Sequence, residues 1–254
     1  MNAVVLGTGP MGRMLAAALA EGGHAVTSHG PPPDGRHTAS AFAGADVVFD
    51  FSTGRAVAAN VAQTLAGGCG RLVIGTTGWH DDRSSVGELL VAHGAAAVAA
   101  ANFSPGVALF GRLVEEAARL FAPLAAYEPF IVEWHRASKL DRPSGTAVEL
   151  SRRLLAAHPR KHRTRDPRHD RPTEPNELEV VSLRAGASPG MHLVGFDAPG
   201  ETLELRLTAR DRSAYAAGAI AAGEWLLRAP RAPGLHPFDA VLADLTDANL
   251  AGSA

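Results

Sequence analysis

A glycine-rich turn near the start of the 254-residue chain most constrains its fold. The turn joins an apolar run at residues 3–6 to a helical pattern at residues 13–21. Glycines in this setting allow a tight bend and let the backbone approach a pyrophosphate at the helix N-terminus. An ordinary strand-to-helix turn is the alternative. The setting favours a dinucleotide-binding site formed by Gly7, Thr8, Gly9, Pro10, Met11 and Gly12.

The end of the second predicted strand, residues 24–28, bears on the choice of coenzyme. An acidic residue there would hold the ribose 2′-hydroxyl of NAD. The chain instead has Ser28 and His29, with Arg36 further along. These side chains can accommodate a 2′-phosphate. The sequence therefore slightly favours NADPH, and NADH is the alternative coenzyme.

Three further apolar runs, residues 46–52, 71–74 and 96–101, read as buried parallel strands. Each ends in small or polar residues. Ligands of open parallel sheets lie outside the carboxyl ends of the strands. A plain loop is the alternative for each end taken alone. The residues expected to line the nicotinamide half of the coenzyme are Phe51, Ser52, Gly75, Thr76, Thr77, Ala101, Asn102 and Phe103.

A short segment, residues 133–147, brings together groups suited to an anionic substrate. The imidazole of His135 and the ammonium of Lys139 can supply a proton. Either Ser144 or Thr146 can cap the following helix, whose positive end favours anions. The alternative is a helix cap after a solvated basic turn. We expect catalysis by His135 and Lys139 and substrate binding by Arg136, Ser144, Gly145 and Thr146.

The same segment resembles the signature of the bacterial dihydrodipicolinate reductase family. The matching residues are Glu133, His135, Lys139, Asp141, Pro143, Ser144, Gly145, Thr146 and Ala147. Asp50-Phe51-Ser52, Gly75-Thr76-Thr77-Gly78 and the stretch from Ala101 to Val107 also resemble family motifs. The resemblance implies an α/β protein. A Rossmann-like dinucleotide-binding domain would span residues 1–104 and 214–254. An α+β substrate-binding and oligomerisation domain with a mixed open sheet would span residues 105–213.

The resemblance also implies a reaction. In this family 4-hydroxy-tetrahydrodipicolinate loses water, and NADPH or NADH donates its C4 hydride to the resulting conjugated cyclic imine dicarboxylate. The product is tetrahydrodipicolinate, an intermediate of lysine and diaminopimelate biosynthesis. Electron density then builds on the ring nitrogen, so a nearby acid must protonate it. By motif, His135 falls on the catalytic histidine and Lys139 on the proposed proton donor. Ser144, Gly145 and Thr146 fall on the turn that grips a substrate carboxylate.

Three departures leave the substrate open. Arg136 stands where the family usually has a second histidine, and Leu207 where it has a histidine in a strand of the second domain. The glycine loop is also one residue shorter than the common form. A paralogue reducing another imine or enamine acid is therefore an alternative. A non-catalytic dinucleotide-binding protein is a second, disfavoured by the presence of His135 and Lys139.

The net charge and composition limit the classes of partner that we expect this protein to bind. The formal net charge is −2, which favours neither nucleic acid nor a membrane surface. Residues 160–175 are basic but lack stacking aromatics and include acids, so we expect a surface loop. We expect no metal site, no signal peptide and a cytoplasmic location. The family assembles through its second-domain sheet, which implies a homotetramer formed around residues 202–207.

Overall fold

The computed structural model describes residues 1–32, 36–166 and 171–251. The chain divides into two compact units. Unit 1 comprises Met1–Pro105 and Arg212–Ala254, and unit 2 comprises Gly106–Asp211. The sequence analysis drew these boundaries after residues 104 and 213. Each unit has its own sheet, and each is described separately below.

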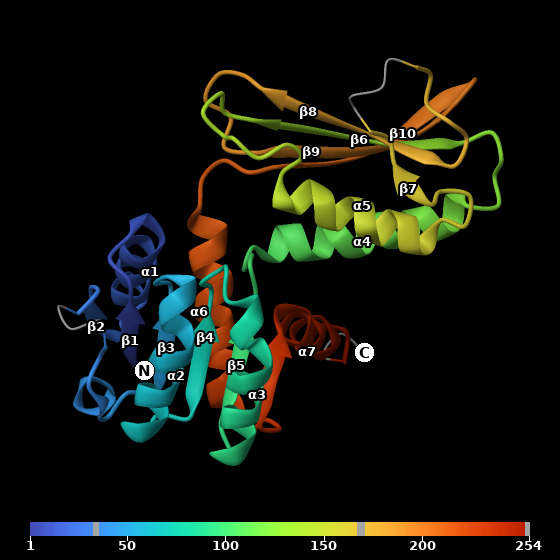
Figure 1. Cartoon of the computed structure of the whole chain (residues 1–254). Helices are drawn as coiled ribbons and strands as arrows, with labels where there is room; N and C mark the ends of the chain where they lie inside the picture. The colour runs from blue at the N-terminus through green and yellow to red at the C-terminus, as the bar shows by residue number, and fades with distance from the viewer. Residues whose placement is uncertain (33–35, 167–170, 252–254) are drawn as a thin grey trace. The chain divides into compact units, whose positions relative to one another are not determined.

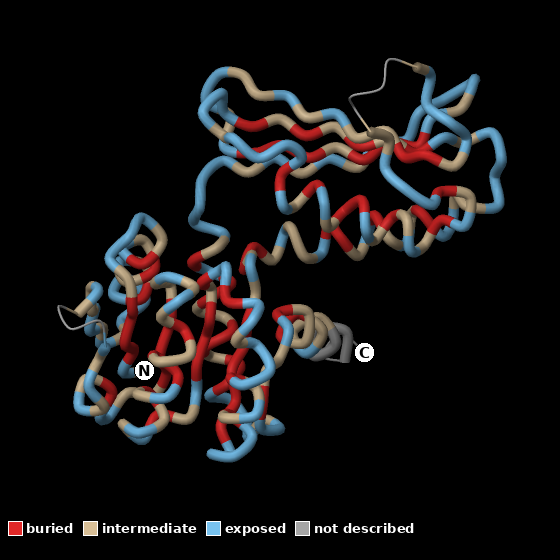
Figure 2. The backbone as a smooth tube through the Cα atoms, in the orientation of Figure 1, coloured by how far each residue is buried: buried red, intermediate tan, exposed pale blue. Residues whose placement is uncertain are grey.

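Unit 1 is built on a parallel sheet (Figure 1). Its strands run in the order β11-β5-β4-β3-β1-β2, and every neighbouring pair is parallel. Their bounds are β1 Asn2–Leu6, β2 Ala25–His29, β3 Val47–Asp50, β4 Arg71–Ile74, β5 Ala96–Ala99 and β11 Gly234–Pro237. Almost every residue of the central strands is buried, as expected where helices cover both faces (Figure 2).

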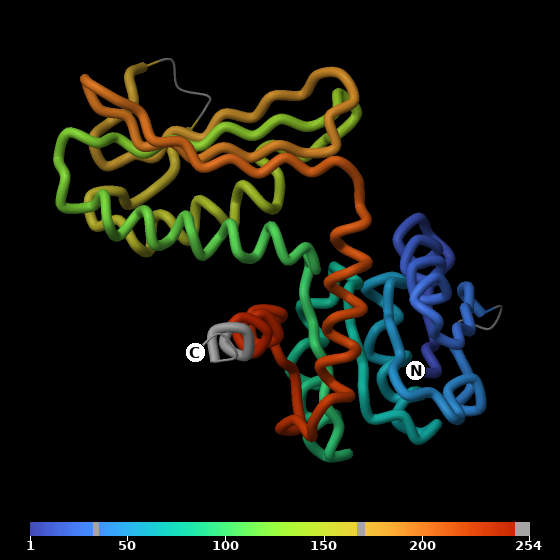
Figure 3. The backbone as a smooth tube through the Cα atoms, turned by 180° about the vertical axis from the view of Figure 1, so that it is seen from behind, coloured from blue at the N-terminus to red at the C-terminus, as the bar shows by residue number. Residues whose placement is uncertain are grey.

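Helices cover both faces of this sheet. Figure 1 shows α2 and α3 in front of the strands, and the reverse view in Figure 3 shows α6 on the opposite face, where α1 packs against it. The bounds are α1 Pro10–Glu21, α2 Val57–Ala66, α3 Arg83–Ala92, α6 Ser213–Arg228 and α7 Phe238–Ala251. Short 3-10 turns lie at Ala39–Phe42, Gly54–Ala56 and His80–Asp82.

The strand order places a topological switch point between β1 and β3. The chain passes from β1 to β2 on one side and then crosses to β3 on the other side of β1. In open α/β sheets a ligand binds in the crevice at such a point, beyond the carboxyl ends of the strands. Gly7 follows β1 and Phe51 follows β3, so two of the predicted coenzyme residues flank this point.

Unit 2 packs two helices on one face of a mixed five-stranded sheet of order β10-β9-β6-β8-β7 (Figure 1). The strands are β6 Glu128–His135, β7 Arg163–Thr164, β8 Glu177–Arg184, β9 Met191–Ala198 and β10 Glu201–Thr208. The helices are α4 Pro105–Phe121 and α5 Gly145–Ala157. Alternate residues of β6 are buried, so Ile131, Glu133 and His135 point to the same side.

The predicted fold class is confirmed, with a parallel Rossmann-like sheet and a second, mixed sheet. Among the described helices and strands, α3, β7 and β11 were not predicted from the sequence. Helix α3 contains two serines and a glycine, which obscure its periodicity, and β11 is a four-residue edge strand that ends in Pro237. Among the described residues, no helix is long and apolar enough to cross a bilayer.

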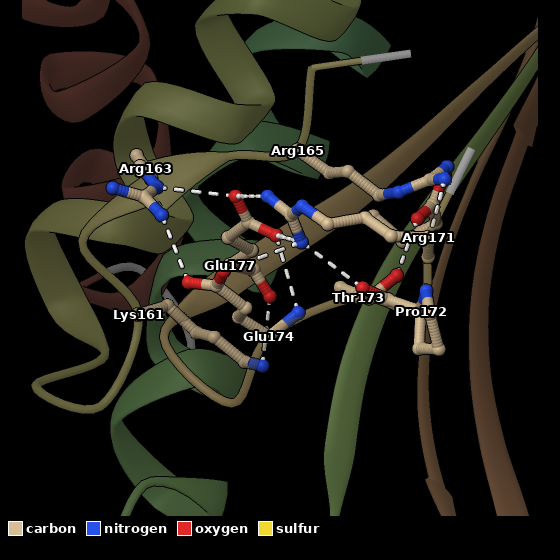
Figure 4. Close-up of polar contacts among 9 residues, drawn as sticks. Lys161, Arg163, Arg165, Arg171, Pro172, Thr173, Glu174 and Glu177 are labelled. Atoms are coloured by element: carbon tan, nitrogen blue, oxygen red, sulfur yellow. Dashed lines mark hydrogen bonds and ion pairs between the residues drawn. The ribbon is translucent and has the colours of Figure 1, made fainter. Parts of the chain in front are cut away.

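The segment expected to be a simple surface loop, residues 160–175, is more structured than predicted, although residues 167–170 lie outside the described part. Strand β7 pairs in parallel with β8. Arg163 and Arg171 both bind the buried carboxylate of Glu177, at 3.1 and 2.8 Å (Figure 4). The Lys161 side chain is buried beside them, where it contacts Glu128 and donates to the Glu177 carbonyl at 2.8 Å. Paired charges therefore tie this segment to the sheet.

Candidate active site

The glycine turn of unit 1 has the backbone that a pyrophosphate requires. Gly7 has φ +105°, which favours glycine, and its N–H donates to the His29 carbonyl at 2.8 Å. A Cβ at Gly12 would collide with the Gly7 carbonyl oxygen, so helix α1 can begin this close to β1 only with glycine there. Gly9, the N-cap of α1, has open space around its Cα and provides no side-chain cap. The first amides of the helix thus remain available for a phosphate, and these residues fit a dinucleotide.

The ends of β3 and β4 are joined by a buried carboxylate that the sequence analysis did not single out. Asp50 is completely buried and accepts hydrogen bonds from the hydroxyls of Ser52 and Thr76, at 2.6 and 2.7 Å, and from the Asn60 amide at 2.9 Å. Both hydroxyls were expected to face the coenzyme. They instead satisfy Asp50, because a buried carboxylate requires several donors. Thr76 is buried, whereas Thr77 is exposed and Phe51, Ser52 and Gly75 are partly exposed.

Aromatic packing fixes the remaining predicted coenzyme residues of unit 1. Phe103 is buried, with its ring centroid 6.2 Å from that of Phe51 and 5.1 Å from that of Phe238. A side chain at Gly75 would collide with the Phe51 ring, so this loop must approach without one. Asn102 accepts the Ser104 amide at 2.8 Å, and Ala101 is exposed. Phe103 is therefore a core residue that supports its neighbours.

Around the end of β2, the side chains differ in exposure. Ser28, Thr8 and Arg36 are exposed, and Met11 is half-buried beside the turn. The Nε2 atom of His29 is buried and has no hydrogen-bond partner within residues 1–32, 36–166 and 171–251. The His29 ring lies 5.7 Å from that of His37. This imidazole nitrogen lies at the end of β2, where the sequence analysis predicted the ribose end of the coenzyme, and it is the type of group that can bind a phosphate or a hydroxyl.

Unit 2 gathers a second cluster around the carboxylate of Glu133, which is fully buried. One carboxylate oxygen, Oε2, contacts Nδ1 of His135. The other, Oε1, accepts from Arg184 at 2.6 Å and from the backbone N–H of Ser144 at 3.1 Å. Burial raises the pKa of Glu133, but hydrogen bonds from Arg184, Ser182 and His135 outweigh it and bring the pKa to about 2. Glu133 is therefore an anion at neutral pH.

His135 lies at the end of β6, with a second buried histidine, His192, close by. The two ring centroids are 5.2 Å apart, and Nε2 of His192 is 3.1 Å from the Ser144 hydroxyl. Burial lowers the pKa of His135, although Glu133 acts in the opposite direction. Burial, reinforced by the positive charge of His135, lowers the pKa of His192 to about 4. His192 is thus neutral near pH 7.

Sequence reasoning did not assign a role to Glu133, Arg184 or His192. The signal was present for Glu133, which begins the family signature. Their convergence depends on sheet register, which pairs Glu133 with His192 on one side and with Ser182 on the other. Leu207 of β10 pairs directly with His192 of β9. Strand β10 therefore lacks the family histidine but lies beside a histidine of the neighbouring strand.

The turn before α5 confirms one of the two expected helix caps. Ser144 is the N-cap, and its hydroxyl accepts the Ala147 amide at 3.2 Å as well as contacting His192. Both the hydroxyl and the amide of Ser144 are thus engaged inside unit 2. Among the described residues, the amides of Gly145 and Thr146 have no such acceptor, and Gly145 is exposed. The part of this turn open to an anion is Gly145 and Thr146.

Lys139 and Arg136 lie on the loop after β6. Lys139 is one-quarter exposed and forms an ion pair with Asp141 at 2.8 Å. Arg136 is exposed and donates to Ser138 at 3.2 Å. Neither contacts the Glu133 carboxylate. Both cations therefore remain at the surface beside the buried His135 cluster, where a negatively charged ligand can reach them.

Glu133, His135 and His192 are also metal-ligand residue types, with candidate atoms within 4.8 Å of one another. The carboxylate oxygens of Glu133 are occupied, however, by Arg184, Ser144 and His135. A guanidinium 2.6 Å away also places a fixed positive charge where a cation would add its own. The arrangement is suited to holding a proton on an imidazole.

Comparison with known proteins agrees with both units. The family model "Dihydrodipicolinate reductase, N-terminus" matches residues 1–103, and "Dihydrodipicolinate reductase, C-terminus" matches residues 106–242. The chain is 30% identical over 245 residues to the 4-hydroxy-tetrahydrodipicolinate reductase of Christiangramia forsetii, covering 96% of this chain and 99% of that protein. The enzyme of the same name from Archaeoglobus fulgidus is 36% identical over 200 residues, covering 77% and 75%.

Solved structures share the fold. Dihydrodipicolinate reductase from Paenisporosarcina sp. TG-14, bound to dipicolinate, superposes with a TM-score of 0.69 at 20% identity, covering 93% of this chain and 97% of that one. The C. glutamicum DAP dehydrogenase in complex with DAP gives 0.52 at 16% identity, covering 94% and 93%. Because the models of both the N-terminal and the C-terminal part of the family match, the chain belongs to the dihydrodipicolinate reductase family and is an NAD(P)H-dependent oxidoreductase.

Proposed function

We propose that this reductase converts 4-hydroxy-tetrahydrodipicolinate to tetrahydrodipicolinate, as in lysine and diaminopimelate biosynthesis. The observation that carries the proposal is the cluster in unit 2, where a buried imidazole, a surface ammonium and an open helix N-terminus lie along one fifteen-residue signature. A dicarboxylate that must be protonated needs these three groups. Relatives carrying that enzyme name, and a related fold bound to dipicolinate, support the same substrate class.

The residues of this chain divide the work by charge. The bound coenzyme supplies a hydride, and the turn from Gly7 to Gly12 holds its phosphates. The amides of Gly145 and Thr146 and the cation of Arg136 bind the carboxylates of the substrate. Lys139 delivers the proton that the ring nitrogen requires, and His135 stabilises the charge that develops there. Ser144 contributes by capping α5.

A direct assay tests this function. The unstable substrate would be generated in place by a synthase and supplied with NADPH or NADH, and coenzyme oxidation followed by absorbance. We expect oxidation that depends on the synthase product and falls when Lys139 is replaced by Ala. Absence of turnover with either coenzyme, in protein shown to bind it, would refute the proposed substrate.

A second candidate is a paralogous imine reductase of secondary metabolism. Arg136 and Leu207 favour it, because both differ from the usual family residues. Arg136 directly follows His135, and Leu207 pairs with His192 in the sheet. An arginine is a rigid, permanently charged donor, whereas a histidine can be neutral. A panel of cyclic imino acids with one or two carboxylates distinguishes the two functions by relative kcat/KM.

We also propose a homotetrameric assembly and a cytoplasmic location. The face of the unit 2 sheet away from α4 and α5 carries Val181 and Leu183, which are 46% and 48% exposed on β8. Exposed apolar residues on an open sheet favour association. A homotetramer formed through this sheet in the cytoplasm would cover them, and light scattering of the purified protein would measure the assembly.

A further inference from the structure

The carboxylate of Glu133 contacts the imidazole of His135 and the backbone of the substrate turn at the same time. Its Oε2 atom contacts Nδ1 of His135, while its Oε1 atom accepts the Ser144 amide at 3.1 Å. Arg184 holds the same Oε1 atom at 2.6 Å, and its own side chain is fully buried. One fixed anion therefore connects β6, β8 and the start of α5.

This contact determines which nitrogen of His135 carries a proton. An ionised carboxylate can only accept hydrogen bonds, so Nδ1 must be the donor. The neutral imidazole then has a free lone pair on Nε2, and the charged form has an acidic N–H there. A Cβ at Gly190 would lie 3.0 Å from Nε2, so the absence of a side chain at position 190 leaves that nitrogen uncovered.

Every other charged or titratable group around His135 leaves this arrangement intact. Arg184 on β8 is paired with Glu133 itself. His192 on β9 points its Nε2 atom at Ser144, and Lys139 on the following loop is paired with Asp141. Among the described neighbours, Glu133 is thus the acceptor that fixes the His135 ring.

We propose that Glu133 is a positioning residue for the reaction, which holds His135 as the Nδ1–H tautomer and aligns it with the turn at Ser144. The inference rests on the function proposed above. Glu133 touches neither substrate nor coenzyme in this role. It makes Nε2 the nitrogen that meets the substrate and keeps the imidazole and the anion-binding amides in one fixed relation.

Replacement of Glu133 by Gln makes a specific prediction. Arg184 and the Ser144 amide both donate to Oε1, so they would hold the amide oxygen of Gln at that position. The amide nitrogen would then face Nδ1 and donate to it, which forces the proton to Nε2. Nitrogen NMR of labelled histidines reports this change directly, and a His135→Asn spectrum assigns the signal.

The matched control is Glu177→Gln. Glu177 is also buried in unit 2, also pairs with arginines, and also has its pKa lowered to about 2. It lies at the start of β8, among the arginines drawn in Figure 4, and not beside His135. A purely structural role for Glu133 predicts equal losses in both variants once the folded fraction is matched.

We expect E133Q to move the His135 proton to Nε2 and to lower kcat by about 100-fold, whereas E177Q changes kcat by less than about threefold. Glu133→Asp, which keeps the charge but shortens the side chain, should restore part of the activity and serves if E133Q does not fold. Persistence of the Nδ1–H signal in E133Q would overturn the proposal, as would full kcat in Glu133→Asp with the Nδ1 proton displaced, or an equal loss of kcat in E177Q. The tautomer readout needs no turnover, so it stands even if the proposed substrate is wrong.

Discussion

The two candidate sites of this protein differ in composition, since one is formed by backbone and the other by buried side chains. The turn of unit 1 consists of backbone, with glycines at positions where a Cβ would collide and no side-chain cap on α1. The cluster of unit 2 consists of buried side chains, in which Glu133, Arg184 and His192 come from three strands. Backbone amides in a fixed turn can bind a ligand by hydrogen bonding, whereas titratable side chains can donate and accept protons. The two sites should therefore respond differently to mutation and to pH.

The largest expected effect comes from Lys139→Ala in unit 2. Loss of the proposed proton donor should lower kcat by about 100- to 1000-fold. The dissociation constant for NADPH, measured by fluorescence titration, should stay the same because the proposed coenzyme contacts belong to unit 1.

The matched control is Arg152→Ala, which removes an exposed cation of α5 that pairs with Glu149. We expect it to change kcat by no more than about twofold. Equal losses of kcat in the two variants, or a large loss of NADPH affinity in Lys139→Ala, would contradict the division of labour between the units.

Gly12→Ala should produce the next largest effect. It should weaken NADPH binding and leave the His135 cluster of unit 2 unchanged, which is the reverse of the result expected for Lys139→Ala. The added methyl group collides with the Gly7 carbonyl, so α1 must shift away from β1. NADPH affinity should fall on the order of 100-fold, since a displacement of about 1 Å has such consequences at a site. The His135 cluster should be unaffected, and histidine NMR would report it.

Gly87→Ala provides the control for Gly12→Ala. Gly87 also lies in a helix of unit 1, but a Cβ there would meet only Leu235, at 3.7 Å. Replacement should stabilise α3 by about 0.5–1 kcal/mol and leave NADPH affinity unchanged. If Gly12→Ala bound NADPH as tightly as Gly87→Ala, the proposed pyrophosphate site would be wrong.

A fall in pH should produce a smaller effect, a loss of folding stability in unit 2. The folded-state pKa of His192, about 4, lies below its ordinary value of 6.5, so the unfolded chain binds a proton first as the pH falls. This loss of stability spans pH 6.5 to 4 and amounts to about 3 kcal/mol. The pKa of Glu133, lowered from 4.5 to about 2, continues the loss below pH 4.5.

Hydrogen exchange resolved by segment measures this pH effect. Amides of β6, β8 and β9 should lose protection as the pH falls from 6.5 to 4, whereas those of β1 and α1 should change little. His192→Asn should flatten the decline over that interval. An equal decline in both units would show that the buried cluster of unit 2 is not its cause.

The backbone of the predicted coenzyme turn could be inferred from sequence because the residues that determine it are adjacent in the chain. The turn from Gly7 to Gly12 specifies its own backbone, and the strand before it and the helix after it are visible in the same short window. The exceptions are Ser52 and Thr76. Their hydroxyls looked available in sequence, but the buried carboxylate of Asp50 requires their donors.

By itself, the sequence determined the family, the alternation of strands and helices, and the positions of His135 and Lys139 in one signature. Only the tertiary structure decided what surrounds them. Arg184 and His192 lie far along the chain from Glu133, and the register of β6 with β8 and β9 brings them to the same carboxylate. Shifting either strand by one residue would turn these side chains to the opposite face, and no local pattern encodes that register.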